Sequence, residues 1–338
     1  MRVGFNYPYP WNAYGVYLGS GNPYGSNPAL DVWPERLAEN LGILRDLGVS
    51  VVRLFLLGNA ANYGSFTAGG FKPPAALDAR VLDQLGRMFE AFARTGVTVV
   101  PSLLDFKAFG RRLPDVANGC GARDAIVRDA TTRAVFVEQV LRPLLRASMP
   151  YRAQIHAWEV MNEPVWNVMP FAPRYIAGGR SLGLRELRGF LRELLDVIEK
   201  PPFGFTSTVG HRFARDLKLF PTGTAPQFHF YPARYRGLYV SDRTLPDAST
   251  TSAFLGEIGA LGGDASGKFR HGHPWRELHG EDARDETSRV ASRLTLARDK
   301  GYELALLWPD VVREPPVGAP DVIKLTPGAQ RGIAAFTR

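Results

Sequence analysis

The 338-residue chain contains 45% hydrophobic and 22% charged residues and carries a net charge of +8. This composition is typical of an ordinary globular protein, and no apolar run approaches the roughly 20 residues that a membrane-spanning helix needs. The basic residues are scattered rather than gathered in a stripe with aromatic residues, which argues against a nucleic-acid-binding protein. Cys120 is the only cysteine, so no internal disulfide is possible. No secretory signal precedes the first expected strand, so we expect a cytoplasmic protein or a processed, secreted form.

Short β-rich runs alternate with amphipathic helical stretches along the chain. Hydrophobic residues that recur every three or four positions predict helices, and short apolar runs rich in branched residues predict buried strands. The expected strands are 3–6, 50–56, 97–104, 155–160, 205–209, 227–231, 252–256 and 303–308. The expected helices are 34–47, 78–95, 131–147, 183–199, 283–299 and 328–336, with Gly96 ending the second of them.

Eight strand-and-helix units without a break in composition predict a single (β/α)8 TIM barrel with long βα loops, formed by one domain over residues 1–338. A doubly wound sheet is the alternative architecture. It is disfavoured because Gly19, Gly21 and Gly25 lie in a loop rich in Pro, Asn and Tyr, with no helix directly behind them. The fifth and sixth units are the least clearly marked, since their helices are short or poorly defined.

Polar and aromatic side chains stand at the ends of most of the expected strands. In a barrel these ends meet at one rim, where chemistry gathers, and a polar group buried without a partner is costly. We therefore predict an active site at this rim. Its candidate residues, in chain order, are Arg53, Asp105, Lys107, Asn162, Glu163, His229, Tyr231, Glu257 and Trp308.

Two glutamates in this set suggest the chemistry. Glu163 ends the run Trp-Glu-Val-Met-Asn-Glu-Pro over 158–164, and Glu257 lies in Phe-Leu-Gly-Glu-Ile-Gly over 254–259. Two carboxyl groups brought together from separate strands can be set to different pKa values, so that one is protonated while the other is ionised. Cleavage of a glycosidic bond requires this division of roles.

These motifs, in this order, resemble those of the clan A glycoside hydrolases, above all the family-five cellulases and mannanases. The resemblance is carried by Asn162-Glu163-Pro164, His229-x-Tyr231, Gly256-Glu257, Trp308 and the strand-two Arg53. It implies a retaining mechanism, with carboxyl groups about 5–5.5 Å apart.

The resemblance also implies a role for each residue. Glu163 would be the general acid and base, and Glu257 would be the nucleophile, kept ionised by Arg53 and oriented by a hydrogen bond from Tyr231. Asn162 would bind the sugar 2-hydroxyl, and Trp308 would form the apolar platform beneath the ring.

One position departs from the family pattern. Family-five enzymes usually place Asp-x-His after strand three, whereas this chain has Asp105-Phe106-Lys107. The lysine removes the expected histidine contact to the sugar and leaves the exact family and substrate open. Lys107, with Arg111 and Arg112 beyond it, would face the sugar if the substrate were anionic.

Several other residues have competing interpretations. Glu159 is expected to be a buried ion-pair partner or rim residue rather than a catalyst, and His156 is expected to be structural. His271 and His273 match a metal-binding His-x-His, but they lie in a late loop rather than on the first strand, so no metal site is expected. Trp166, Trp275 and the aromatic residues of the first loop either form sugar platforms or pack against the barrel.

The leading hypothesis is a retaining β-glycoside hydrolase acting on a glucan- or mannan-type glycan. The alternatives are a carbohydrate-binding barrel that has lost catalysis and a metal-dependent hydrolase, and transglycosylation would use the same residues. We expect a monomer that binds a β-linked oligo- or polysaccharide, with no cofactor, no metal, no nucleic acid and no membrane partner.

Overall fold

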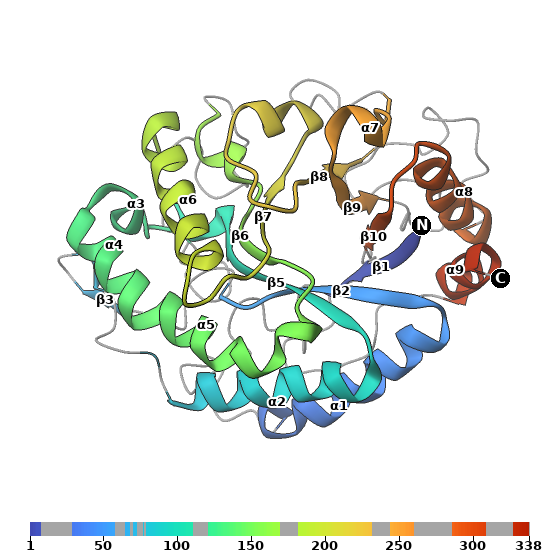
Figure 1. Ribbon diagram of the computed structural model, residues 1–338, viewed down its shortest axis with the longest axis horizontal. Coiled ribbons are helices and arrows are strands. Elements are labelled where there is room, and N and C mark those ends of the chain that lie inside the picture. Colours follow the sequence, from blue (N-terminus) through green and yellow to red (C-terminus); the bar gives the residue numbers. More distant parts are fainter. Residues whose placement is uncertain are drawn as a thin grey trace.

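The computed structural model describes residues 1–7, 29–57, 65–67, 70–72, 77, 79–110, 121–169, 182–231, 244–259, 286–308 and 327–337. Within them, eight parallel strands close into a barrel in the order β1-β10-β9-β8-β7-β6-β5-β2 (Figure 1). The strands are β1 (Arg2–Asn6), β2 (Val49–Phe55), β5 (Thr98–Asp105), β6 (Trp158–Asn162), β7 (Ser207–His211), β8 (Gln227–Phe230), β9 (Phe254–Gly259) and β10 (Leu304–Trp308). The predicted barrel is therefore confirmed.

Helices surround the barrel (Figure 1). The longest are α1 (Ala29–Asp46), α2 (Ala79–Thr95), α6 (Leu184–Glu199), α8 (Glu286–Asp299) and α9 (Pro327–Thr337). Their periodicity explains their packing, since α6 buries Leu187, Phe190, Leu191, Leu194, Leu195 and Ile198 along one face. Gly96 ends α2 as predicted, with a left-handed φ of 73° that glycine adopts without steric cost.

The predicted helix at 131–147 is confirmed, as a continuous helical segment that contains one irregular turn. It consists of α4 (Ala130–Phe136), a π-helical turn (Val137–Leu141) and α5 (Arg142–Ser148), and the short α3 (Ala125–Arg128) precedes it. Pro143 supplies a physical reason for the irregular turn, because it has no N–H to donate to the carbonyl of Gln139. That carbonyl instead accepts the backbone N–H of Leu77 at 3.3 Å.

Two further differences concern short elements. The antiparallel pair β3 (Ser65–Thr67) and β4 (Gly70–Lys72) follows β2 and was not predicted. The fifth and sixth units carry short helices in the described residues, namely a 3-10 helix η6 (Ala214–Lys218) after β7 and α7 (Ala248–Thr251) before β9. Within the described residues, these short helices agree with the weak sequence signal in the two units.

The inside of the barrel changes character along its axis. A small apolar cluster of Val51, Val100, Phe254, Leu304 and Leu306 fills one end. Further along the strands, the fully buried polar side chains of Arg53, Ser102, Glu159 and Gln227 follow. This polar layer supports the strand ends that bear the candidate site. None of the helices in the described part of the chain has both the length and the apolar character needed to cross a membrane.

Candidate active site

Arg53 on β2 is the centre of a buried polar network that crosses the barrel. Its Nε and Nη2 donate to the two carboxylate oxygens of Glu159 at 2.7 and 2.6 Å. Its Nη1 donates to Glu257 at 2.7 Å and to Asn6 at 3.0 Å, and its Nη2 also donates to Asn162 at 2.8 Å. All five N–H donors of the guanidinium are therefore used, which satisfies a charge fully removed from water.

Glu159 on β6 is an ion-pair partner inside the barrel, as predicted, and is fully buried. It also accepts hydrogen bonds from Ser102 Oγ at 2.7 Å and from Gln227 Nε2 at 2.5 Å. Burial alone would raise the pKa of Glu159, but the charge and hydrogen bonds of Arg53 lower it below its ordinary value. Arg53 thus favours the ionised form of Glu159, and both carboxylate oxygens of Glu159 hold the guanidinium in place.

Glycine at position 256 makes room for this network. A Cβ at Gly256 would lie 1.8 Å from the side-chain oxygen of Gln227. The glycine of the Gly256-Glu257 motif therefore has a structural explanation, because any larger residue would displace the Gln227 side chain that donates to Glu159.

Glu163 follows β6 in an uncommon backbone conformation. Its φ of 47° and ψ of 53° place it in the left-handed region, which costs a non-glycine residue of order 1–3 kcal/mol. Its N–H donates to the carbonyl of Gly210 on β7 at 2.7 Å, and Pro164 follows it. Proline disfavours the right-handed helical region for the residue before it, so the turn aims the Glu163 side chain across the barrel mouth rather than continuing the chain as a helix.

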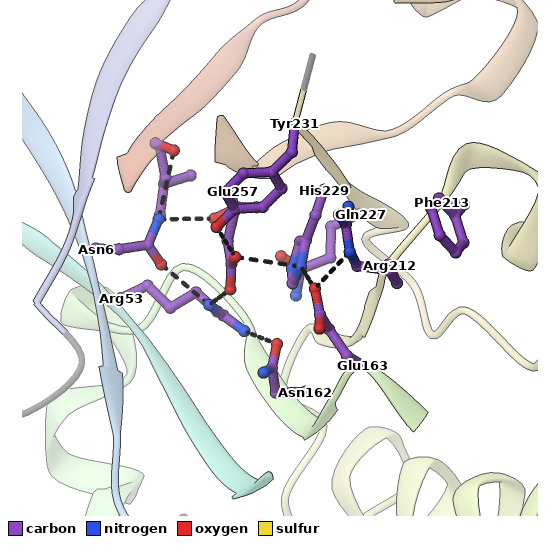
Figure 2. Close-up of polar contacts among 12 residues, drawn as sticks. Asn6, Arg53, Asn162, Glu163, Arg212, Phe213, Gln227, His229, Tyr231 and Glu257 are labelled. Carbon is purple, nitrogen blue, oxygen red and sulfur yellow. Dashed lines mark hydrogen bonds and ion pairs between the residues drawn. The ribbon is translucent and has the colours of Figure 1, made fainter. Parts of the chain in front are cut away.

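The two predicted carboxyl groups face each other across His229 (Figure 2). His229 Nδ1 lies 2.8 Å from Glu163 Oε1 and 3.4 Å from Glu257 Oε2. One carboxylate oxygen of each glutamate and one ring nitrogen of His229 all lie within 4.8 Å of one another. The side chains of Glu163 and Glu257 are 11% and 4% exposed, so both are largely shielded from water.

The two carboxyl groups have different partners. Glu257 forms an ion pair with Arg53 and accepts a hydrogen bond from the Tyr231 hydroxyl. Glu163 accepts a hydrogen bond from the indole N–H of Trp166 and lies 3.5 Å from Arg212 Nε (Figure 2). The predicted contacts of Arg53 and Tyr231 to Glu257 are therefore present in the structure.

Burial dominates the acid–base properties of the site. It raises the pKa of Glu163, against the opposing charge of Arg212, and it raises the pKa of Glu257, against His229 and Arg53. Burial also lowers the pKa of His229 to about 3, so this imidazole is neutral. The pKa values of Glu163 and Glu257 thus shift in the same direction, and not in the opposite directions that would separate an acid from an ionised group. The two carboxyl groups differ in their contacts instead.

The remaining predicted residues surround this pair. Asn162 Nδ2 donates to Asp105 at 2.9 Å, so Asp105, which is 1% exposed, lies behind Asn162. Lys107 and Trp308 are both partly exposed at the rim. Trp166 is only 4% exposed, and its ring packs against Phe106 and Phe213, so its place is beside Glu163 within the wall of the site.

Sequence reasoning missed three residues of the site. Asn6 joins the first, seventh and eighth strands by donating to the carbonyls of Gly256, Leu306 and Leu307, at 3.0, 3.3 and 3.3 Å. Gln227 and Arg212 were also missed. A polar residue at the end of the first strand was the available signal for Asn6, whereas nothing local marks Arg212.

The donor set of Glu163, His229 and Glu257 has the spacing of a metal site. The charges around it oppose that role, because Arg53 contacts one of these carboxylates at 2.7 Å and Arg212 lies 3.5 Å from the other. The two carboxyl groups are therefore better placed to act as acid–base or nucleophilic groups than to bind a metal cation. The other metal candidates, His271 and His273, lie outside the described residues, as do Arg111, Arg112, Trp275, Cys120 and the first loop from residue 8 onward.

Comparison with solved structures identifies proteins of the same architecture. A β-1,4-mannanase from the sea hare Aplysia kurodai superposes with a TM-score of 0.67 at 17% identity, covering 99% of this chain and 92% of that chain. The chain therefore shares the (β/α)8 barrel fold of this enzyme. A variant of GH5_18 from Streptomyces cattleya, in complex with Manβ1-4GlcNAc, gives a TM-score of 0.63 at 16% identity over 99% of this chain and 80% of that chain.

An exo-β-1,4-mannosidase from Opitutaceae bacterium strain TAV5 is also similar, with a TM-score of 0.60 at 15% identity, covering 100% of this chain and 59% of that chain. The resemblance inferred from the sequence motifs is confirmed at the level of the fold. No family model matches the chain, and no curated protein matches it by sequence.

Proposed function

We propose that the protein is a retaining β-glycoside hydrolase that cleaves a β-linked glycan of the mannan or glucan type by double displacement. The observation that carries the proposal is the pair of carboxyl groups, Glu163 and Glu257, whose oxygens lie within 4.8 Å of each other at the barrel mouth. This short separation is characteristic of retaining enzymes, because inverting enzymes need room for a water molecule between the two groups.

The contacts of the two carboxyl groups support a division of roles. Glu257 pairs with Arg53 and accepts a hydrogen bond from Tyr231, and both contacts favour its ionised, nucleophilic form. Glu163, in its left-handed turn, has the more exposed side chain of the two, and burial raises its pKa. When the pair holds one proton, that proton belongs on Glu163, which lacks the Arg53 contact.

The reaction then proceeds in two balanced steps. Glu163 donates its proton to the glycosidic oxygen as the bond to the leaving sugar breaks and Glu257 bonds to the anomeric carbon. Glu163, now ionised, removes a proton from water, which attacks the same carbon and releases Glu257. Asn162 would bind the 2-hydroxyl, and the half-buried Trp308 would support the sugar ring. A mannan-type substrate is the first candidate, because the similar structures include enzymes named as mannanases.

The decisive experiment combines a substrate panel with product stereochemistry. Purified protein is assayed on mannan, glucomannan, β-glucans and chromogenic β-glycosides, and the anomeric form of the first product is recorded by NMR. A β-configured product is expected. An α-configured first product contradicts the retaining mechanism, and tight binding without cleavage of any of these glycans favours the carbohydrate-binding alternative.

Variants test the two roles separately. Glu257→Gln and Glu163→Gln should each lower kcat by several orders of magnitude, because each removes an essential catalyst. Azide should restore activity to Glu163→Ala on an activated substrate and yield a β-glycosyl azide, since azide needs no general base. Glu193→Gln, at a half-exposed glutamate on α6 paired with Arg133, is the matched control and should retain full activity.

A further inference from the structure

Arg212, directly after β7, places a positive charge against Glu163. Its Nε lies 3.5 Å from Glu163 Oε1, and its side chain is 12% exposed. Two aromatic rings hold the guanidinium there, Tyr231 at 4.7 Å and Phe213 at 4.9 Å from ring centroid to Cζ. Figure 2 shows Arg212 on the side of Glu163 that faces away from Glu257. Of the two carboxyl groups, Glu163 is the one within ion-pair distance of Arg212.

This placement opposes the role proposed for Glu163. A general acid must be protonated when the glycosidic oxygen reaches it, and an adjacent cation favours the ionised form. Burial raises the pKa of Glu163, whereas Arg212 is the strongest opposing influence and Lys107, after β5, acts in the same direction. The other groups near Glu163 include Trp166, which donates a hydrogen bond to it, the neutral His229, whose Nδ1 lies 2.8 Å away, Arg53, Asp216 and Glu257.

A substrate anion would remove this conflict. A general acid contacts the glycosidic oxygen, so groups beyond it, away from the nucleophile, face the leaving sugar. A carboxylate on the leaving sugar would form an ion pair with Arg212 in place of the Glu163 carboxylate. Burial would then hold the proton on Glu163 without opposition from Arg212.

Resting on the proposed hydrolase function, we propose that Arg212 determines specificity by binding the carboxylate of a uronic acid residue on the leaving-group side of the scissile bond. Its guanidinium is suited to a carboxylate because it can donate two parallel hydrogen bonds. Its contacts with the Tyr231 and Phe213 rings restrict its conformations, so we expect little conformational entropy to be lost when it binds. The substrate class is thus a β-linked glycan with an acidic residue at the position that departs.

The test compares two β-1,4-linked disaccharides that differ in one group. The reducing-end residue is glucuronic acid in one and glucose in the other, and each is prepared with mannose and with glucose at the non-reducing end. For the wild-type protein, kcat/KM should be about tenfold or more higher on the acidic member of each pair. Arg212→Gln should abolish this preference, so that the ratio of kcat/KM on the acidic member to kcat/KM on the neutral member falls to about one, whatever the change in either value alone. Arg212→Lys should restore part of the preference.

Arg215 provides the matched control. It also stacks on Phe213, at 4.3 Å, but its pairing partners do not include Glu163. Arg215→Gln should therefore keep the full preference for the acidic disaccharide. Thermal unfolding of each variant checks that the fold is intact, and Arg212→Lys carries the test if Arg212→Gln does not fold.

Two outcomes would overturn the proposal. Equal loss of kcat/KM on both disaccharides would show that Arg212 only positions Glu163, and equal turnover of both by the wild type would show no anion selection. Calorimetry with the Glu257→Gln variant and the acidic disaccharide separates this proposal from the hydrolase proposal. If the acidic disaccharide binds in an Arg212-dependent way but the wild type does not cleave it or any neutral glycan, the anion site is supported and the hydrolase proposal fails. If the wild type cleaves neutral glycans only, the hydrolase proposal is supported and the anion site fails.

Discussion

Arg53 and Glu159 contact each other through two parallel hydrogen bonds of 2.7 and 2.6 Å, and neither side chain is exposed to solvent. The same guanidinium reaches Glu257 on the other side. Arg53 thus connects Glu159, inside the barrel, to the candidate nucleophile Glu257 at the strand ends. Its replacement should therefore affect both the stability of the fold and the activity.

Removing Arg53 should therefore destabilise the fold. Arg53→Met leaves Glu159 and Glu257 buried without their cation, and we expect the free energy of unfolding in urea to fall by about 3–5 kcal/mol. Arg53→Lys should fall between this variant and the wild type, because an ammonium group has three donors where five are used. The control is Arg45→Met, at a surface ion pair whose side chains are 53% and 69% exposed, where a change below about 1 kcal/mol is expected. If Arg53→Met and Arg45→Met lower the free energy of unfolding equally, the buried ion pair contributes no more to stability than the surface pair.

Gly256→Ala tests the close contact with Gln227. The added Cβ would lie 1.8 Å from the Gln227 oxygen, so the glutamine must move away from Glu159, at a cost of about 1–3 kcal/mol in unfolding free energy. Shortening the neighbour in the double variant Gly256→Ala with Gln227→Ala should cost less than the sum of the two single changes. Gly86→Ala in α2 meets no atom within 4 Å and should stabilise the protein by up to about 1 kcal/mol. Simple additivity would argue against the steric explanation.

The Tyr231 hydroxyl should matter for rate rather than for folding. Tyr231→Phe removes the hydrogen bond to Glu257, and kcat should fall by about 10- to 100-fold, which corresponds to one hydrogen bond to a charged group. The matched control is Tyr302→Phe, which removes a hydroxyl bonded to the Pro246 carbonyl outside the site. Steady-state kinetics on the substrate identified by the panel measures both, and unchanged kcat in Tyr231→Phe would remove this residue from the mechanism.

Glu163→Gln should stabilise the fold while it abolishes activity. Burial raises the pKa of Glu163 above its ordinary 4.5, so its contribution to stability is fully present below pH 4.5 and decreases as the pH rises toward the raised value. The neutral variant escapes this loss, and its advantage should grow from nothing near pH 4 to roughly 0.5–2 kcal/mol at pH 7. Urea unfolding across this range measures it, with Glu39→Gln, at a side chain 62% exposed, as the control. If the stability of Glu163→Gln relative to the wild type decreases with rising pH, the pKa of Glu163 is not raised in the folded protein.

His156 should make the protein sensitive to acid. Burial lowers its pKa from 6.5 to about 4, with Arg2 acting in the same direction. Between these values the unfolded chain binds a proton that the folded protein excludes, so wild-type stability falls as the pH drops from 6.5 to 4. In His156→Gln this contribution is absent, and the melting temperature should depend less steeply on pH over that interval. Parallel curves for the two proteins would exclude the effect.

Local patterns in the sequence were sufficient for the strands and for the two glutamates. Each strand is a short apolar run, and each catalytic candidate stands where such a run ends, so the barrel and the position of Glu163 and Glu257 at its rim could be predicted. The π-helical turn within the 131–147 helix could not, because the carbonyl of Gln139 contacts the N–H of Leu77, far away in the chain.

The spacing of apolar residues in the strands, the order of the eight units and the type of residue at each strand end could be read from neighbouring residues. Which side chains contact one another depends on closure of the barrel. Asn6 contacts Gly256 across 250 positions, Arg53 contacts Glu257 across 204, and Arg212 comes to face Glu163 from the neighbouring strand. The physical reason is that burial, ion pairing and pKa depend on distances through space, and chain closure sets those distances.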